Sequence, residues 1–259
     1  MNVWEKLRSL FGDNQPVEAV FEGEWISYLS SNLPLYARIP QTVKESLHQK
    51  IAHFVRSTYF EGCGGLELTD EMIITVAGQA CILILNHPGE PYPNLKTILI
   101  YPSAFSSVTK SVDPMGIVTE KRVTRLGESW SNGTVVLAWD SVQRGAKNIF
   151  DGHNVTFHEF AHQLDQEDGK GDGVPTFPTA QAYHTWSQVL FEEYQELRKK
   201  AEKRKRAVMD HYGALNTAEF FAVATESFIE KPKQMKKKHP ELFAELKAYY
   251  GFDPSEWLT

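Results

Sequence analysis

The stretch VTFHEFAHQLDQEDG, Val155 to Gly169, carries two histidines four residues apart, with a glutamate directly after the first. Residues four apart lie on one face of a helix, so His158 and His162 can direct ring nitrogens at a common position, as zinc requires. Glu159 is one residue further round, beside such a metal, where a general base can take a proton from a bound water. The uncharged flanking residues favour a helix buried beneath an active site, with Asn154 as its N-cap.

The pattern alone leaves two interpretations open, because an ordinary amphipathic helix can also carry two histidines at this spacing. A zinc site needs a third protein ligand, and two candidates follow directly in the sequence. Asp165 is not the glycine that would break the helix and fold a ligand back, so the helix should carry Asp168 away from the metal. Asp165 itself stays on the face of His162, where it either holds a ligand ring by a hydrogen bond or is solvated.

A more distant candidate lies in HYGALNTAEFFAVATESFIE, residues 211–230. A helix is expected to begin at Asn216 or Thr217, and Glu219 and Glu226 then share a face otherwise made of Ala, Val and Phe. Buried carboxylates need a partner, and a metal is a good one. Glu219 is therefore a candidate third ligand and Glu226 a residue that orients a ligand from behind, unless both are solvated at the edge of the helix.

The combination of HEFAH with YGALNTAEFFA resembles the Mlc titration factor A family of zinc metallopeptidases. That family shares its active-site pattern with the catalytic domain of anthrax lethal factor. The shared elements are His-Glu-x-x-His and a tyrosine, Tyr212 here, seven residues before a glutamate that opens a helix. The stretches TILIYPSAF, GESWSNGTVVLAWDS and GVPTFP also resemble the family, so the similarity covers roughly residues 60–250.

The resemblance implies a zincin-like fold in which one zinc ion per chain is bound by His158, His162 and Glu219. It also implies that Glu159 is the general base and that Tyr212 points at the substrate carbonyl. The implied activity is that of a peptidase, mainly an aminopeptidase acting on small peptide substrates. The family also binds the glucose-responsive transcriptional repressor Mlc, so an Mlc-like repressor is an expected partner.

Two functions of different classes therefore compete. The first is a zinc-dependent peptidase, and the second is a non-catalytic regulatory protein that sequesters a repressor and keeps a structural or vestigial metal. The presence of Glu159 favours catalysis, because a purely structural site needs no general base. In zincin-like folds a strand before the metal helix pairs with the extended substrate, and TVVLAW, residues 134–139, is the expected strand.

The order of the remaining elements predicts an α+β fold that is mostly helical with a small mixed sheet. An N-terminal helical segment, residues 1–60, is expected to pack on a catalytic domain formed by residues 61–259. A long helix is expected over residues 179–208, and Gly251 is expected to end the last helix. Short β-branched runs bounded by Pro or Gly predict strands of the sheet within residues 95–105, 115–123 and 133–141.

The composition excludes several other classes. The 259 residues carry a net charge of -6, which argues against a protein that binds nucleic acid directly. The first residues, MNVWEKLRSLFGDNQ, lack the apolar core of a signal peptide, and no apolar run is long enough to span a membrane. We therefore expect a cytoplasmic protein with Cys63 and Cys81 reduced, and with the basic runs 198–206 and 231–240 on a solvated helix face and a loop.

Overall fold

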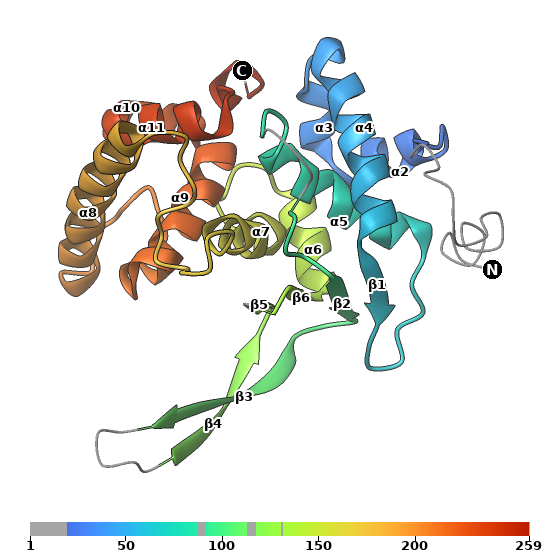
Figure 1. Cartoon of the computed structure of the whole chain (residues 1–259), viewed down its shortest axis with the longest axis horizontal. Helices are drawn as coiled ribbons and strands as arrows, with labels where there is room; N and C mark the ends of the chain where they lie inside the picture. Colours follow the sequence, from blue (N-terminus) through green and yellow to red (C-terminus); the bar gives the residue numbers. More distant parts are fainter. Residues whose placement is uncertain (1–19, 88–91, 113–117, 131, 259) are drawn as a thin grey trace.

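The computed structural model describes residues 20–87, 92–112, 118–130 and 132–258, and it confirms the predicted α+β class, mostly helical with a small mixed sheet (Figure 1). The N-terminal stretch MNVWEKLRSLFGDNQ, which is not expected to be a signal peptide, lies outside these residues. Within them, no helix is both long enough and apolar enough to cross a membrane.

The N-terminal part of the described chain is helical and ends in a helix that is almost wholly buried. Its helices are α2 (Trp25–Asn32), α3 (Pro34–Arg38), α4 (Gln41–Ser57) and α5 (Asp70–Leu83). Thr69 is the N-cap of α5, because its hydroxyl accepts a hydrogen bond from the backbone N–H of Met72. Leu29 and Leu33 press so closely on Gly78 that an added Cβ would lie 2.5 and 2.7 Å from their methyl groups. The glycine therefore lets α2 and α5 pack in direct contact.

The main sheet has four strands in the order β1 (Tyr59–Gly62), β2 (Thr97–Tyr101), β6 (Thr134–Ala138) and β5 (Gly127–Trp130). The first three run parallel, whereas β5 pairs antiparallel with β6 and forms one edge.

The prediction that residues 115–123 form a strand of this sheet is wrong. Within the described residues, β4 (Val118–Arg125) instead pairs with β3 (Phe105–Val112) in a separate two-stranded hairpin. A β-branched run indicates a strand but does not identify the strand with which it pairs.

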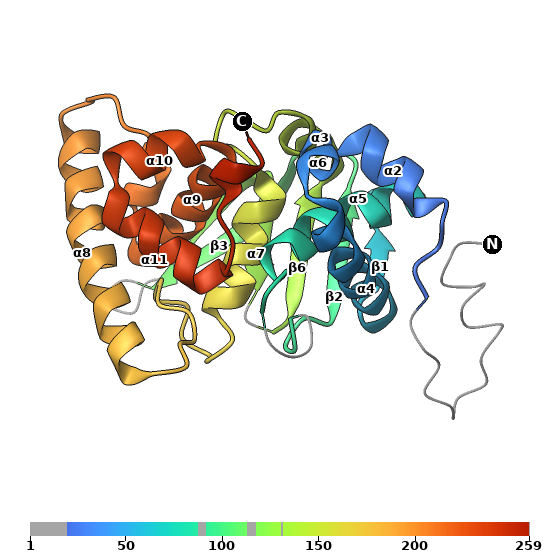
Figure 2. The same cartoon turned by 90° about the horizontal axis from the view of Figure 1, so that it is seen from above.

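Helices follow the sheet to the end of the described chain (Figure 2). They are α6 (Trp139–Lys147), α7 (Val155–Asp165), α8 (Ala180–Glu202), the 3₁₀ turn η1 (His211–Ala214), α9 (Thr217–Glu230), α10 (Pro232–Lys238), α11 (Pro240–Tyr250) and the 3₁₀ turn η2 (Pro254–Glu256). Gly251 adopts φ 74° and ends α11, as predicted.

Helix α8 stops earlier than predicted, at Glu202 rather than Val208. Arg204 adopts a left-handed conformation with φ 50°, and the backbone N–H of Lys205 returns to the carbonyl of Lys200. This is the hydrogen-bond pattern of a Schellman ending, formed here around an arginine. Crowded like charges in the basic run 198–206 disfavour further helix, so the chain turns there.

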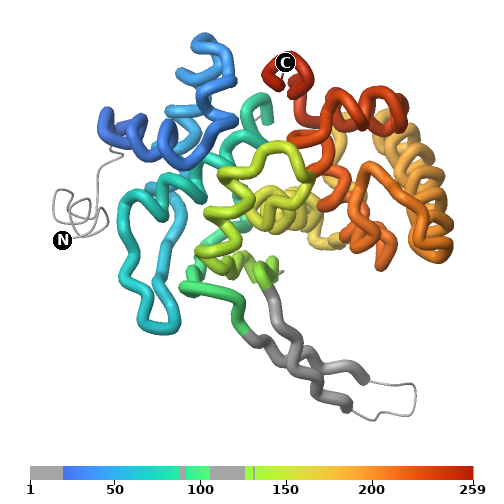
Figure 3. Tube along the Cα trace, turned by 180° about the vertical axis from the view of Figure 1, so that it is seen from behind, coloured from blue at the N-terminus to red at the C-terminus, as the bar shows by residue number. Residues whose placement is uncertain are grey.

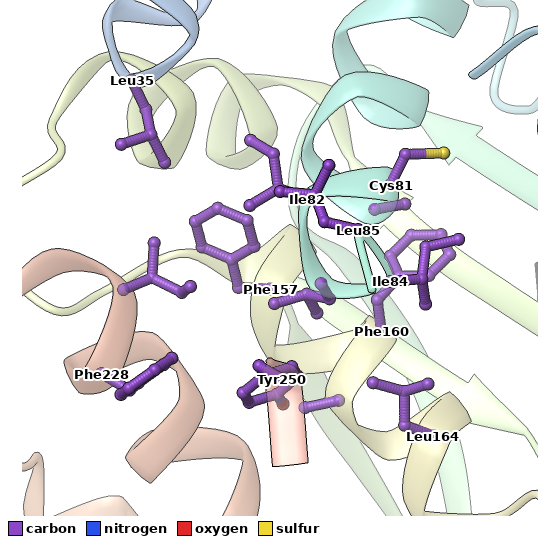
Figure 4. Packing of buried hydrophobic residues seen from close by; sticks show 14 of the residues in the cluster. Leu35, Cys81, Ile82, Ile84, Leu85, Phe157, Phe160, Leu164, Phe228 and Tyr250 are labelled. Carbon is purple, nitrogen blue, oxygen red and sulfur yellow. The ribbon is translucent and has the colours of Figure 1, made fainter. Parts of the chain in front are cut away.

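Helix α7 lies between the N-terminal and the C-terminal helices (Figures 2 and 3). Its buried side chains Phe157, Phe160 and Leu164 pack against residues from the end of α5 and against Phe228 and Tyr250 from the C-terminal helices (Figure 4). Full burial of one such side chain contributes about 1.5–3 kcal/mol to folding. One buried cluster runs from residue 25 to residue 258. The division of the chain at residue 60 stays a prediction.

Candidate metal centre

Asn154 fixes the start of the helix that carries both histidines. Its carboxamide oxygen accepts a hydrogen bond from the backbone N–H of Phe157 at 3.1 Å, which confirms the predicted N-cap of α7. Because Phe157 and its apolar neighbours fill the core, His158 and His162 are left on a partly buried face toward α9. Asn216 caps α9 in the same way through the N–H of Glu219, so both helices begin at defined positions.

Three side chains from these two helices converge. Nε2 of His158 lies 2.9 Å from Oε2 of Glu219 and 3.2 Å from Nε2 of His162, and the remaining pair, His162 and Glu219, is 3.4 Å apart. Ligand atoms about 2.0–2.1 Å from a tetrahedral zinc ion lie about 3.3–3.4 Å from one another. The three distances are close to this spacing, and two imidazoles with a carboxylate are a donor set that zinc accepts. The donor set therefore fits a zinc ion.

A second layer of contacts holds His158 from behind. Oε2 of Glu226 lies 3.3 Å from Nδ1 of His158, while Oε1 of Glu226 accepts the backbone N–H of Asn154 at 2.7 Å. The Asn154 side-chain amide donates to Oε1 of Gln79 at 2.9 Å and to Oε1 of Glu230 at 3.2 Å. These buried bonds tie the start of α7 to both α5 and α9, and they orient the ring of His158.

The charges of this cluster compete for protons. Burial opposes protonation of His158, but the carboxylates of Glu226 and Glu219 outweigh it and raise the pKa of the ring well above its usual value. Burial would raise the pKa of Glu219, but its hydrogen bonds with the two histidines hold that pKa below its usual range. A metal ion must displace the proton on His158, so metal affinity falls as the pH falls.

Glu159 lies beside the convergent donors. Its side chain is 6% exposed, and burial raises the pKa of its carboxyl group. The wall against it is Gly127 on β5, where an added Cβ would lie 2.5 Å from Oε1 of Glu159 and 2.7 Å from a methyl group of Val155. The backbone of β5 thus approaches the carboxylate as closely as a glycine allows.

Tyr212 reaches the same place from η1. The ring centroids of Tyr212 and His158 are 5.9 Å apart, and Asp210 fixes the backbone by accepting the N–H of Tyr212 at 2.6 Å. The tyrosine side chain is 47% exposed and lines the pocket that also contains Glu159. Its neighbour His211 instead donates a ring N–H to the carbonyl of Lys205, at 2.9 Å.

The pocket has a volume of about 440 Å³, which is large enough for a small molecule or a short peptide segment. Strand β5, helix α6, the loop before α7, helix α7 itself, η1 and α9 supply its walls. His158 and Glu159 lie on one wall, and Arg144 of α6 belongs to another. His158, one of the three converging donors, therefore faces a cavity that has its own polar groups.

The expectation that residues 134–139 pair with a substrate is wrong. Residues 134–138 form β6, which has β2 on one side and β5 on the other, so both of its hydrogen-bonding edges are occupied. The edge strand beside the metal helix is β5, and Gln163 of α7 donates to the hydroxyl of Ser129 in it at 2.7 Å. A strand of four residues that includes glycine gives too weak a local signal to be recognised from the sequence.

The two aspartates after the histidines lie apart from the metal donors. Both carboxylate oxygens of Asp165 accept the backbone N–H of Gly173, at 2.8 and 2.9 Å, and burial raises the pKa of Asp165 to about 6. Asp165 therefore stabilises the loop after α7 instead of orienting the ring of His162. Asp168 forms an ion pair with Lys170 at 2.9 Å on that loop.

Sequence reasoning missed Glu230 and Gln79. Glu230 is 2% exposed, and its Oε2 also accepts the backbone N–H of Gly152 at 2.9 Å. Burial raises the pKa of Glu230 to about 9, because its hydrogen bonds only partly offset the loss of water. The spacing of Glu219, Glu226 and Glu230 by seven and four residues does contain a signal, since such positions share one helix face. Gln79 lies on an almost entirely buried helix without a polar face, so no sequence pattern marked it.

Comparison with known proteins gives a consistent result. The model of the glucose-regulated metallo-peptidase family M90 matches residues 10–251. An uncharacterized protein of Synechocystis is 42% identical over 232 residues, which are 89% of this chain and 84% of that protein. The Mlc titration factor A of Klebsiella pneumoniae is 30% identical, over 86% of this chain and 84% of its own length. The protein of the same name from Salmonella arizonae is 27% identical, over 93% and 96% respectively.

Proposed function

This chain belongs to the glucose-regulated metallopeptidase family M90, and we propose that it is a zinc-dependent peptidase acting on short peptides, with aminopeptidase specificity. The observation that carries the proposal is the convergence of His158, His162 and Glu219 beside a pocket that is lined by His158 and also by Glu159. A structural metal site has no use for a buried carboxylate beside its ligands, whereas hydrolysis needs one.

The residues of the pocket divide the chemistry among them. When bound by the two histidines and Glu219, zinc supplies a water of lowered pKa and polarises the scissile carbonyl. Glu159, whose pKa burial has already raised, takes the proton from the attacking water and later passes it to the leaving amine. The hydroxyl of Tyr212 donates a hydrogen bond to the carbonyl oxygen as negative charge develops there.

Strand β5 aligns the substrate in this proposal. Its outer edge has no neighbouring strand in the described sheet, so an extended peptide can add to it by backbone hydrogen bonds. Gly127 lies on this strand directly against Glu159, so a peptide paired along β5 passes the general base. The substrate backbone is thereby held where the attacking water is activated.

Substitution of Glu159 by Gln tests the proposal. The amide has nearly the same shape but cannot relay a proton, so we expect kcat for small aminoacyl and peptide substrates to fall by about 10²–10⁴-fold. Zinc content, measured by elemental analysis, should remain at one ion per chain because Glu159 is beside the ligands and is not one of them. Wild-type turnover by Glu159→Gln would show that the measured activity arises elsewhere.

A second role is favoured by the names of the relatives. Proteins called Mlc titration factor A are similar over most of the chain, and the family is described as glucose-regulated. We propose that the chain also binds an Mlc-like glucose-responsive repressor in the cytoplasm, on a surface outside the pocket. In the alternative without catalysis, repressor binding is the sole function and the metal is structural.

Purified Mlc-type repressor provides the test. Wild-type protein and Glu159→Gln should capture it equally in a pull-down, since the substitution lies inside the pocket. Loss of peptide hydrolysis without loss of capture would separate the two roles. Failure of the wild-type protein to capture the repressor would remove the second role and leave the peptidase proposal standing.

A further inference from the structure

Arg144 is a pocket residue whose charge the proposed mechanism does not use. It lies in the last turn of α6, is exposed, and belongs to the wall of the pocket that His158 and Glu159 also line. Within the described residues, its guanidinium has no hydrogen bond, ion pair or ring contact with another side chain. An arginine left unpaired in a ligand pocket is available to a planar anion, above all a carboxylate.

The acidic side chains of the same pocket are already engaged. Asp151 accepts from the side-chain amide of Asn148 and from the backbone N–H of His153. Asp210 accepts the N–H of Tyr212, and its other oxygen lies 3.6 Å from the ring of His153. These carboxylates stabilise the loops around the pocket, so the unpaired charge offered to a ligand is the positive charge of Arg144.

Arg144 lies on the helix of the pocket wall that packs against the start of the metal-ligand helix α7. The neighbouring Gly145 packs on Asn154, where an added Cβ would lie 3.0 Å from the Cα atom. Asn154 precedes His158 by one helical turn, a rise of about 6 Å. One extended residue spans about 3.3–3.6 Å, and the arginine side chain adds its own reach. An arginine on this wall is therefore suited to a carboxylate about one residue away from the scissile bond.

We infer that Arg144 recognises a carboxylate on the substrate residue immediately after the scissile bond. Two sources carry this chemistry, namely the terminal carboxylate of a dipeptide and an acidic side chain at that position. The inference rests on the proposed peptidase function and adds the substrate class to it. Because the contact is a charge-assisted hydrogen bond, its loss should lower kcat/KM for such substrates by roughly 10- to 100-fold.

Assays of the zinc-loaded protein with four substrates distinguish the two sources of the carboxylate. Ala-Ala is compared with Ala-Ala-amide for a terminal carboxylate, and Ala-Glu-amide with Ala-Gln-amide for an acidic side chain. In at least one pair the wild-type protein should prefer the carboxylate at least about tenfold in kcat/KM, and Arg144→Gln should bring that ratio close to one. Arg144→Lys should keep part of the preference, because lysine retains the charge but not the planar fork.

Lys147→Gln is the matched control, since Lys147 is an exposed cation on the same helix that is not among the residues of the pocket wall. It should leave both ratios unchanged. Calorimetry of Ala-Ala and Ala-Glu-amide binding to the Glu159→Gln protein gives a readout without turnover. Addition of Arg144→Gln to this protein should weaken binding of whichever of the two ligands belongs to the pair in which the wild-type protein prefers the carboxylate.

The possible failures are distinguishable. If the wild-type protein hydrolyses both members of each pair but Arg144→Gln changes neither ratio, the inference is wrong and the peptidase proposal stands. If Lys147→Gln changes the ratios as much as Arg144→Gln, the effect is one of general surface charge and the inference is again wrong. If the wild-type protein cleaves none of the four faster than Glu159→Gln, the proposed function fails and the inference falls with it.

Discussion

Two buried acids have pKa values that are shifted in opposite directions by their surroundings. Glu230, behind the candidate metal centre, is 2% exposed, and Asp253, near the C-terminus, is 5% exposed. Among the described residues, Glu230 receives hydrogen bonds from neutral groups only, and burial raises its pKa to about 9. Burial also opposes ionisation of Asp253, but hydrogen bonds from Ser255 and two lysine ammonium groups outweigh it and lower the pKa.

The two regions accommodate buried carboxylates in different ways. In the C-terminal cluster (Lys236, Lys247 and Asp253), both ammonium groups lie 3.3 Å from the carboxylate while half or more of each lysine side chain stays in water. In the site cluster (Glu219, Glu226 and Glu230), three acids share one helix face beside the histidines, without a lysine or arginine among their described partners. The first arrangement stabilises an ionised carboxylate with two lysines, whereas the second relies on the two histidines to stabilise Glu219 and leaves Glu230 costly to ionise.

Glu219→Gln should have the largest effect of the substitutions in the two clusters. An amide is a much poorer zinc ligand than a carboxylate, so zinc occupancy by elemental analysis should fall from one ion per chain to a small fraction. The melting temperature without metal should fall as well, because the ionised carboxylate of Glu219 is stabilised by its hydrogen bonds with His158 and His162. Full zinc occupancy in this variant would exclude Glu219 as the ligand.

Tyr212→Phe should act on catalysis alone. Removal of one hydrogen-bond donor to the developing oxyanion is expected to lower kcat by about 10²–10³-fold. Zinc content and thermal stability should match the wild-type protein, since the ring and the backbone bond to Asp210 remain. A kcat within twofold of wild type would assign Tyr212 a packing role only.

Glu226→Gln should weaken metal binding without abolishing it. Glu226 touches the far nitrogen of His158, and loss of such a partner typically lowers metal affinity by about 10–100-fold. Competition with a chromophoric zinc chelator measures the change. If the zinc affinity of this variant equals that of the wild-type protein, Glu226 does not support His158 as a metal ligand.

Asp253→Asn should show the reverse behaviour in the C-terminal cluster. The amide turns an N–H₂ group toward two ammonium groups, and we expect a loss of about 1–3 kcal/mol in the free energy of unfolding. Zinc content and kcat of the folded protein should remain at wild-type values. Chemical denaturation gives the energy, and a matching fall in zinc affinity would mean that the two clusters are coupled.

The smallest expected effect is a difference between Glu230 and Asp253 in how each makes the stability of the fold depend on pH. The folded-state pKa of Glu230 lies above its unfolded value, so its contribution is complete below about pH 4.5 and is lost as the pH rises toward 9. The loss from this group is at most about 1.4 kcal/mol per pH unit. Asp253 has a depressed pKa, and its contribution is lost only as the pH falls below about 4.

Denaturation of the zinc-free protein at pH 6 and pH 7 compares wild type with Glu230→Gln. Stability of the wild-type protein should fall more over this interval, because the amide has no proton to release. Parallel losses in the two proteins would show that Glu230 is already ionised at pH 6. Asp253→Asn should leave the difference between the two pH values unchanged.

Local rules predicted the parts of the molecule that local chemistry determines. Asn154 and Gly251 mark helix ends because their side chain or conformation satisfies backbone groups at that position, whatever the rest of the fold does. The same locality applies to His158 and His162, whose spacing on α7 follows from helical geometry alone. Glu219 was a candidate third ligand from its place on an apolar helix face, and the family resemblance implied it as the ligand.

The remainder depends on contacts between distant segments. No pattern in residues 127–130 announces that β5 takes the edge of the sheet, because strand order is decided by which strands find one another. Gln79 and Glu230 meet Asn154 across 75 and 76 residues of chain. The end of α8 at Glu202 also escaped prediction, since a left-handed arginine at position 204 has no strong sequence signal.

The contact between Gly127 and Glu159 affects how sequences of relatives should be compared. An added methyl group at position 127 would lie 2.5 Å from the carboxylate oxygen and would force it aside. A homologue could therefore retain every histidine and glutamate of the metal centre and still lose hydrolysis through one alanine on the opposite strand. Such a protein would pass any test based on the His-Glu-x-x-His motif, and it would be free to evolve as a pure binding protein. The residue at position 127 is thus as informative about catalytic competence as the motif itself.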